Sequence, residues 1–529
     1  MEKKKPAVMG SKLFLYATSF FSGMSVMAIE LGASRLLAPY FSSSQIVWTV
    51  IIGTIMIAMA IGNVWGGRSA DRHPEPARLF SRLLLVAVWT ALIPFLGRYA
   101  IAGVSGLLAL FVGSNFLVWA SLCSCLVLFV FPLMLLGTVT PSLMKYTTDS
   151  LDDNGKTLGE LEALNTIGSI IGTFLPTFVT IPAVGTARTF LIFAAILAIL
   201  SLIFFISRRR WIARGALCAL IITGLVFAPM NYSFAFWEGD DVVLEDESIY
   251  NYLQVKEDER RIALSTNVAF GVQSIKVKDG GMTGMYYDYA LAAPLMADKV
   301  EDVLILGLGT GTFAEQCLEY FPGCSVTGVE IDRKIVDISR EYFGLPEEVE
   351  AITGDGRAWL TASEGSWDVI MVDAYQDITI PFQMSSVEFF TEVYEHLAPG
   401  GVMVVNMSMR SESEGSMNEY LMDTIASVFP HVYTVRVSGG TNLELFASAD
   451  EGALSRFEAR RPSLPDDYAA IMQRVHDGLL PVEGGDYILT DDKAPVELLG
   501  MRVLDEIIGA ELDTLRGQIA EEGIMGLLE

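Results

Sequence analysis

The first 230 residues contain a series of apolar runs, each close to the roughly 20 residues that a helix needs to cross a bilayer. A further apolar stretch, 99–113, is shorter than the others. The runs predict an α-helical multi-pass transmembrane domain over residues 1–236, with seven or eight helices in the lipid bilayer of the cell (inner) membrane. They lie at 13–31, 45–65, 79–97, 116–137, 161–182, 187–206 and 212–230.

The remainder of the chain differs from this part in charge. Residues 1–236 hold 17 Lys and Arg and 9 Asp and Glu, which leaves 19 of the 36 basic and 54 of the 63 acidic residues for the C-terminal part. A surface this acidic attracts polycations through its summed field. We expect no nucleic-acid partner for it. Solubility alone also explains the charge, so charge does not choose a function.

Short strands with charged turns replace the apolar runs near Trp237. Alternating stretches such as "SIYNYLQVKED" and "RRIALSTN" predict a small antiparallel β-sheet subdomain over 237–298. Strands and helices then alternate over 299–529, which predicts a Rossmann-like α/β domain with a parallel sheet and helices on both faces. The expected strands are 302–307, 325–331, 349–353, 367–373 and 401–407.

Polar residues follow four successive strands, where ligands of such sheets bind. The glycines of "GLGTG" at 307–311 let backbone amides at a helix N-terminus approach a ligand. Glu330, after the second strand, is near the spacing at which an acid accepts hydrogen bonds from ribose hydroxyls. The pattern lacks the spaced third glycine of nicotinamide folds and suits S-adenosylmethionine or its decarboxylated form. The candidate cofactor-binding residues are Gly307, Gly309, Thr310, Gly311, Glu330, Asp355 and Gly356, and Asp373 ends the fourth strand.

These segments resemble those of the spermidine synthase (polyamine aminopropyltransferase) family. "YYDYALAAPL" at 286–295 matches the segment after the family's small sheet, and "GLGTGT", "VEID", "GDGRAWL" and "VIMVDAY" follow in family order. The whole chain resembles the membrane-fused long forms. In its N-terminal half, "GGRSADR" is similar to a cytoplasmic loop of major-facilitator transporters, although a tight turn also explains it.

The resemblance implies roles for individual residues. Glu330 would hold the ribose and Asp355 the adenine amino group. Asp373 would take the proton of the attacking amine, which is nucleophilic only when neutral, and Tyr286 would orient that amine. Because the sulfonium is already an activated leaving group, positioning is most of the remaining task. Tyr287 stands at a position of polar cofactor contact, and Asn251 stands where relatives often have Gln.

Two departures from the family concern the substrate site. Thr310 occupies the position of an acid that binds the donor's ammonium, and Gln376, followed by Asp377, occupies that of a second acid after the base. Thr310 could therefore admit a donor that keeps its carboxylate. "YILTDDKAPVELL" at 487–499 resembles an element of the fused forms, in which Asp491 and Asp492 either line the amine cleft or begin the following helix.

We therefore predict a membrane-anchored aminopropyltransferase that uses decarboxylated S-adenosylmethionine and a polyamine such as putrescine. We see no cluster of metal ligands. One alternative is an S-adenosylmethionine-dependent methyltransferase or other transferase on the same fold. Another is a polyamine transporter or sensor whose binding domain is not catalytic. The amine acceptor and the oligomeric state, including a homo-oligomer, stay open.

The side of the membrane depends on the helix count. Lys3, Lys4 and Lys5, and the arginines between 68 and 82, place the N-terminus and the second loop in the cytoplasm. With seven helices the C-terminal domain would lie outside, and with eight it would lie inside but would leave Arg208, Arg209 and Arg210 outside. We choose eight and a cytoplasmic domain, because the expected cofactor is cytosolic.

Overall fold

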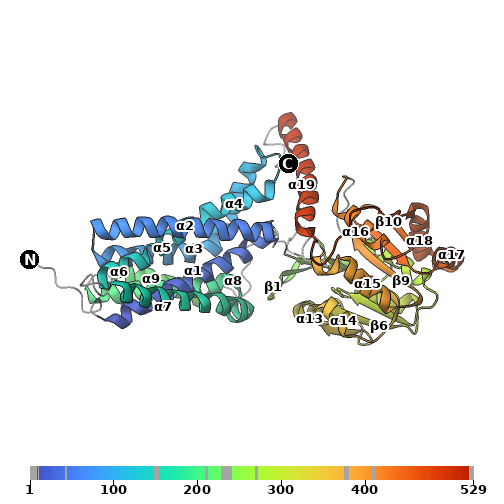
Figure 1. Cartoon of the computed structure of the whole chain (residues 1–529), viewed down its shortest axis with the longest axis horizontal. Coiled ribbons are helices and arrows are strands. Elements are labelled where there is room, and N and C mark those ends of the chain that lie inside the picture. The colour runs from blue at the N-terminus through green and yellow to red at the C-terminus, as the bar shows by residue number, and fades with distance from the viewer. Residues whose placement is uncertain are drawn as a thin grey trace, which may run out of the picture.

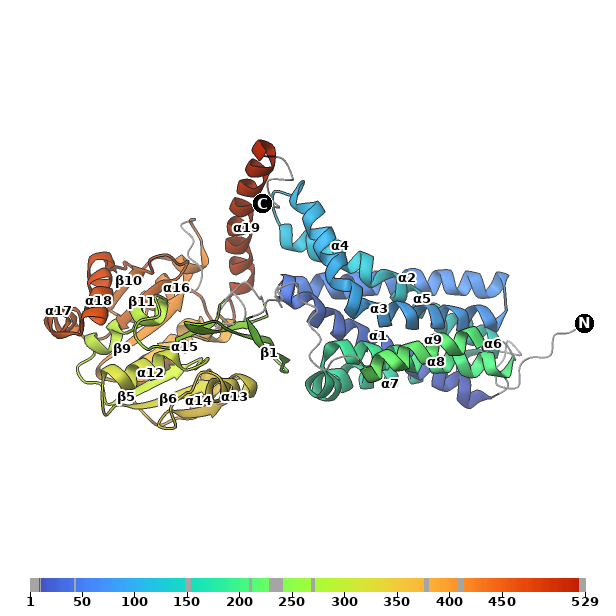
Figure 2. The ribbon, with the colours of Figure 1, turned by 180° about the vertical axis from the view of Figure 1, so that it is seen from behind.

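The protein consists of a bundle of long helices followed by an α/β domain (Figures 1 and 2). The computed structural model describes residues 9, 11–41, 44–147, 154–208, 212–227, 241–267, 272–374, 380–407 and 413–522. The predicted boundary at 236 and 237 lies outside the described residues. The helices of the bundle are α1 (Lys12–Phe41), α2 (Gln45–Arg72), α3 (Pro76–Ala109), α4 (Phe116–Leu128), α5 (Val130–Gly137), α6 (Val139–Thr147), α7 (Asn154–Leu175), α8 (Ile181–Ser207) and α9 (Ile212–Phe227).

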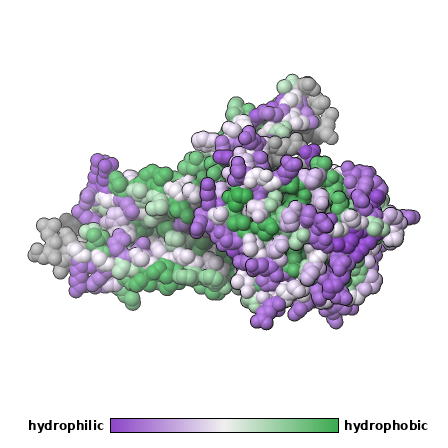
Figure 3. All heavy atoms as spheres, turned by 45° about the vertical axis from the view of Figure 1, so that its right-hand side comes forward, coloured by the Kyte–Doolittle hydropathy of each residue, from purple (hydrophilic) through white to green (hydrophobic). Residues whose placement is uncertain are grey.

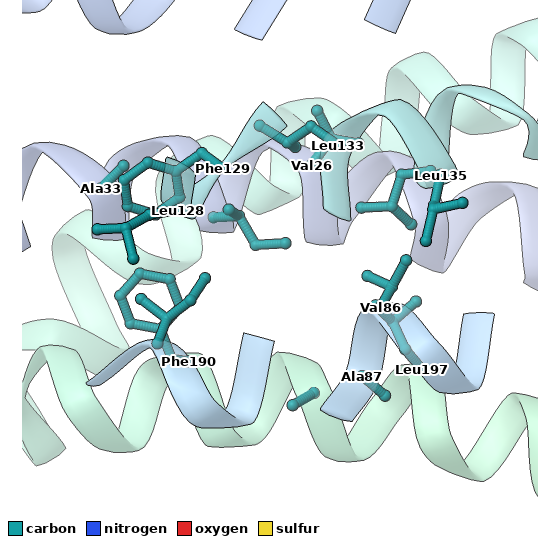
Figure 4. Packing of buried hydrophobic residues seen from close by; sticks show 14 of the residues in the cluster. Val26, Ala33, Val86, Ala87, Leu128, Phe129, Leu133, Leu135, Phe190 and Leu197 are labelled. Atoms are coloured by element: carbon teal, nitrogen blue, oxygen red, sulfur yellow. The ribbon is translucent and has the colours of Figure 1, made fainter. Parts of the chain in front are cut away.

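Small residues allow the helices of the bundle to pack closely, as in membrane helix pairs. A Cβ atom at Gly23 of α1 would lie 2.2 Å from the carbonyl oxygen of Asn165 of α7, and one at Gly62 of α2 would lie 2.2 Å from that of Met134 of α5. Larger apolar side chains fill the interior, and Figure 4 shows Leu128, Phe129 and Phe190 among them. The helices therefore form one apolar core.

Apolar side chains also cover the outside of the bundle. Figure 3 shows hydrophobic residues spread over this half, whereas the α/β domain is largely hydrophilic. A contiguous apolar surface of this kind marks a contact with lipid or with another protein. Its exposed residues include Met56, Ile57, Phe174, Phe178 and Leu220.

Fewer separate spans are found than the seven or eight that the sequence predicted. Among the described helices, four are long and apolar enough to cross a membrane, and the bent pair Phe116–Leu128 and Val130–Thr147 makes a fifth if it is one span. Residues 99–109 are no separate helix, because α3 continues through them. The number of four spans takes α7, α8 and the π-helical turn Pro176–Thr180 between them as one stretch over 155–207, although Gly185 interrupts it with φ 79° and ψ 166°. The 16-residue α9 falls short of the length required.

A four-stranded antiparallel sheet begins the α/β domain, as predicted. Its strands, in order β1-β2-β3-β4, are β1 (Val242–Glu247), β2 (Tyr252–Glu257), β3 (Arg261–Thr266) and β4 (Ser274–Val277). The short helices α10 (Tyr286–Ala290) and α11 (Ala292–Met296) lead from it to the large sheet.

The large sheet has eight strands in the order β12-β10-β11-β9-β8-β5-β6-β7. Strands β5 to β9 are parallel and match the five predicted strands, whereas β10, β11 and β12 add an antiparallel edge that was not predicted. The strands are β5 (Asp302–Leu306), β6 (Ser325–Glu330), β7 (Glu350–Thr353), β8 (Trp367–Val372), β9 (Leu397–Met407), β10 (His431–Arg436), β11 (Leu443–Ser448) and β12 (Leu480–Pro481).

Helices cover both faces of this sheet. Side chains alternate along each strand, so each strand presents apolar residues to both faces, and both must be buried. Val303 and Ile305 face one apolar cluster with α10, α11, α12, α17 and α18, and Leu304 and Leu306 face another with α14, α15 and α16. The covering helices are α12 (Thr312–Tyr320), α13 (Arg333–Glu341), α14 (Gly356–Ala362), α15 (Val387–His396), α16 (Met417–Ala426), α17 (Ala453–Arg460) and α18 (Asp466–Gly478).

The last helix, α19 (Val496–Glu522), returns from the α/β domain to the bundle (Figure 1). Arg516 donates hydrogen bonds to the carbonyl oxygens of Ala109 and Val112. At the same end of the bundle, buried Glu247 of β1 accepts hydrogen bonds from the amide and hydroxyl of Thr186. The two halves are thus joined by polar contacts as well as by the chain.

Candidate active site

A cavity opens at the carboxyl ends of β5, β6 and β8, where the chain order of the sheet reverses between β5 and β8. Ligands of open α/β sheets bind at such switch points. Residues of the small sheet, of α10 and of the segment 381–384 line its other sides. Residues that line it include Tyr250, Asn251, Gln273, Ser274, Tyr286, Tyr287, Gly307, Gly309, Glu330, Asp355, Gly356, Asp373, Gln383 and Met384.

Gly307 allows β5 and β8 to approach at the switch point. Its φ of 94° is rarely adopted by other residues, and a Cβ atom there would lie 2.4 Å from the carbonyl oxygen of Asp373. The amide of Gly309 donates a 2.9 Å hydrogen bond to Glu330. The glycine turn therefore holds the carboxylate of Glu330 beside the cavity and lies against the backbone of Asp373.

Glu330 ends β6 and is buried. Its Oε2 accepts the hydrogen bond from Gly309, and its Oε1 accepts one of 3.0 Å from the amide of Asp332. Burial raises the pKa of Glu330, and these backbone hydrogen bonds oppose the rise. The carboxylate is thus held in one orientation at the cavity wall, with lone pairs left for a ligand hydroxyl.

Asp355 lines the cavity and also caps a helix. Its Oδ1 accepts a 2.8 Å hydrogen bond from the amide of Ala358 at the start of α14. The cap fixes the side chain beside Gly356, which lines the same part of the cavity.

Asp373 follows β8 and lies between two donors. The hydroxyl of Tyr286 donates to its Oδ2 at 2.6 Å, and the amide of Asn406 donates to its Oδ1 at 2.8 Å. Burial raises the pKa of Asp373 to about 7, although both hydrogen bonds lower it. A carboxylate with such a pKa can accept a proton near neutral pH.

The segment 286–288 is fixed by its own hydrogen bonds. Buried Asp288 accepts from the amides of Thr283 and Gly284 and from the side chain of Gln316. Tyr287 donates to the carbonyl oxygen of Gln273, and its ring lies 4.0 Å from that of Tyr286 between centroids. Both phenols therefore face the cavity in a rigid arrangement.

Asn251 lines the cavity as well, but its side chain is already paired. Its amide nitrogen donates to Asp332 at 2.9 Å, and its amide oxygen accepts from Asn267 at 2.9 Å. Asn251 thus lines the cavity within a hydrogen-bond network that also fixes Asp332, which follows β6.

Four predicted residues lie elsewhere. Thr310 and Gly311 belong to the turn but are not among the residues that line the cavity, whereas Gly309 before them and Thr312 at the start of α12 do line it. Asp491 and Asp492 are not among the residues that line this cavity: Arg357 binds Asp491 at 2.7 Å, and Asp492 is exposed. Their role in an amine cleft stays a prediction. Neither belongs to α19, which begins at Val496. Gln376 and Asp377 lie outside the described residues.

Sequence reasoning missed several residues of the site. Asn406, which contacts Asp373, stands near the end of a predicted strand and could have been found by the rule that selected the other strand ends. Tyr250, Gln273 and Ser274 come from the small sheet, and no motif marks them. In the described part of the chain, no three His, Cys, Asp or Glu residues are grouped as a metal site.

Comparisons with known proteins agree with this geometry. Residues 285–439 match the spermine/spermidine synthase domain. A "Probable polyamine aminopropyl transferase" of Bifidobacterium longum is 50% identical over 346 residues, which cover 62% of this chain and 77% of the relative. The chain belongs to the polyamine aminopropyltransferase family. As a member of that family it is a transferase.

Other relatives of this aminopropyltransferase-family chain are more distant. The polyamine aminopropyltransferase of Vibrio vulnificus is 28% identical over 206 residues, which cover 37% of this chain and 68% of the relative. A probable spermidine synthase from Corynebacterium glutamicum, 22% identical, has a TM-score of 0.38 and covers 45% of this chain and 90% of that structure. A spermidine synthase in complex with the transition-state analogue AdoDATO is 15% identical and has a TM-score of 0.36. The match covers 52% of this chain and 89% of that structure.

Proposed function

We propose that this chain transfers the aminopropyl group of decarboxylated S-adenosylmethionine to a nitrogen of a polyamine such as putrescine. The observation that carries the proposal is the position of Asp373 at the wall of the cavity that lies at the carboxyl ends of the strands, with its carboxylate held by Tyr286 and Asn406. Family membership and the matched domain support the same activity.

The reaction would use the residues of the cavity as follows. Asp373 takes a proton from the acceptor's ammonium, which leaves a neutral amine with a free electron pair. The amine nitrogen attacks the aminopropyl carbon bound to sulfur, the carbon–sulfur bond breaks, and its electrons return to sulfur. Methylthioadenosine leaves as a neutral thioether. The nitrogen of the new secondary ammonium keeps its two remaining protons, and Asp373 releases the proton that it took to solvent.

The donor would lie along the ends of β5, β6 and β7. Glu330 is placed to accept hydrogen bonds from the ribose hydroxyls and Asp355 from the adenine amino group, and the glycines at 307 and 309 admit the nucleoside close to the backbone. Tyr286, fixed against Asp373, orients the incoming amine. These roles extend the resemblance residue by residue onto the cavity wall.

A second candidate is a transferase that uses S-adenosylmethionine itself. It is favoured by the glycine turn, where the amide of Thr310 is directed at Ser274 and no acidic residue is present to bind an ammonium and exclude a carboxylate. A methyltransferase relative, the eEF1A lysine and N-terminal methyltransferase of Danio rerio, is 28% identical over 167 residues.

Donor preference separates the two candidates. The full chain in detergent would be titrated calorimetrically with decarboxylated S-adenosylmethionine and with S-adenosylmethionine, and products with putrescine would be identified by mass spectrometry. Tighter binding of the decarboxylated donor together with spermidine supports aminopropyl transfer. Tighter binding of the carboxylated donor without spermidine would overturn it.

We also propose that the helical half is embedded in a membrane, as in the membrane-fused long forms with a major-facilitator-like N-terminal half. The support is its apolar outer surface and the length of its helices. Flotation of the full chain with liposomes, compared with a chain that lacks residues 1–236, tests this. Recovery of both proteins in the soluble fraction would contradict it.

The side on which the α/β domain lies remains a proposal with two opposed arguments. A cytosolic donor places the domain in the cytoplasm, as the sequence analysis expected. The course of the helices favours the other side. Helix α3 provides no extra crossing at 99–113, and α2, α6 and α8 end far from the α/β domain (Figure 1). Arg72, Lys145 and Arg208 belong to or follow the last turns of these three helices. Labelling single cysteines at exposed Glu458 and at exposed Glu75 with an impermeant reagent on intact cells decides between them.

A further inference from the structure

A buried acidic residue lies near the cavity and is not used by the proposed reaction. Glu444 of β11 has no exposed surface, and neither of its carboxylate oxygens has a hydrogen-bond partner among the described residues. An unpaired carboxyl group in the interior costs free energy, so its presence calls for an explanation.

The register of the sheet places this carboxyl group on the same side as the proposed base. Glu444 is directly opposite Asn406 of β9, and directly opposed residues of antiparallel strands point to the same face. Asn406 is the residue that donates to Asp373. The next pair on that face, Val404 and Phe446, packs with Tyr286 in one apolar cluster.

The electrostatics of the two acids agree with this placement. Burial raises the pKa of Glu444 well above its ordinary value, and the negative charge of Asp373 raises it further. Two carboxylates near each other and with no cation among their described partners form a site that a cationic ligand would stabilise.

We propose that Glu444 binds the second, non-reacting ammonium group of a diamine or polyamine acceptor. This inference rests on the proposed function, since it assigns the far end of the acceptor whose near end meets Asp373. Strand β9 separates β8 from β11, so about 10 Å lies between their backbones at the usual strand spacing. Asn406 of β9 lies in this gap, since it donates to Asp373 and stands directly opposite Glu444.

Comparing a diamine with a monoamine tests the role of Glu444. The full chain in detergent would be assayed with decarboxylated S-adenosylmethionine and either 1,4-diaminobutane or butylamine, for the wild type, Glu444→Gln and Glu444→Leu. We expect both variants to raise the KM for the diamine about tenfold or more, as loss of a charge-assisted contact does. The KM for butylamine should stay within about twofold, because butylamine has no second charge.

Equilibrium binding keeps the test independent of turnover. The same proteins would be titrated with both amines in the presence of methylthioadenosine. We expect the wild type to bind the diamine with a lower Kd than the monoamine, and both variants to lack this preference. Glu458→Gln, an exposed glutamate of α17, is the matched control and should keep the preference. Melting temperatures show whether each variant is folded.

The outcomes distinguish this inference from the proposed function. If the wild type forms no aminopropylated product from either amine, the proposed function fails, while the binding preference still tests Glu444. If the Glu444 variants bind the two amines as the wild type does, or lose both equally, the inference is overturned even when the enzyme is active.

Discussion

The hydroxyl of Tyr286 lies 2.6 Å from one carboxylate oxygen of Asp373, and the other oxygen accepts from Asn406. The carboxylate thus has fixed orientation in a buried site, yet its pKa of about 7 leaves a large fraction able to accept a proton at neutral pH. This relationship joins a residue before β5 to the end of β8 and defines the reacting end of the cavity.

Replacing Asp373 by Asn should remove the proton acceptor and keep the shape of the site. We expect kcat to fall about 10²- to 10⁴-fold, the usual contribution of a general base, with the Kd for the donor nearly unchanged. Steady-state kinetics and donor titration measure the two quantities. Asp337→Asn, on the exposed side of α13, is the control. Equal activity of the two variants would rule out Asp373 as the base.

The pH dependence of the reaction should report the ionisation of Asp373. Only the deprotonated base accepts a proton, so kcat/KM should rise with pH through about 7 and level off above it. Tyr286→Phe removes a hydrogen bond that favours the charged carboxylate, so the pKa should increase and the rising limb should move to higher pH. A limb that stays in place or moves to lower pH would contradict this assignment.

Glu330→Gln should weaken binding of methylthioadenosine and of the donor. The amide retains one acceptor oxygen but loses the charge that strengthens hydrogen bonds from ribose hydroxyls, a loss of about 1–3 kcal/mol, or about 5- to 150-fold in Kd. Calorimetric titration measures the change, and 2′,3′-dideoxy analogues of the nucleoside provide the control. Wild type and variant should bind such an analogue with similar affinity, and a large difference there would exclude a contact with the ribose.

Two glycines with the same φ allow steric contact to be separated from backbone strain. Gly307 and Gly323 both have φ 94°, but an added Cβ would lie 2.4 Å from Asp373 at the first and would meet nothing within 4 Å at the second. Gly307→Ala should therefore lower the melting temperature and the activity more than Gly323→Ala, which carries only the strain of about 1 kcal/mol. Thermal unfolding of both variants and their kcat measure this. Similar losses in both would mean that β5 and β8 tolerate separation.

Much of the site could be predicted from the sequence, because its residues follow consecutive parallel strands. Alternation of strands and helices places the carboxyl ends of β5, β6, β7 and β8 at one edge, so Gly307, Glu330, Asp355 and Asp373 were found without the structure. The sequence also determined the division into an apolar and an acidic part, because the cost of exposing apolar surface to water acts locally along the chain.

Only the tertiary structure decided which other side chains meet these residues. Glu444 stands opposite Asn406 because of the register of an antiparallel strand, which depends on long-range pairing. Asp491 is bound by Arg357, which is far from it in the sequence. The division of apolar residues into helices likewise depended on where α3 continues and where Gly185 interrupts the chain. The sequence itself specifies which residues are apolar or charged. Packing between distant segments determines which of them meet, because the free energy of a polar contact depends on its burial and on the neighbouring groups.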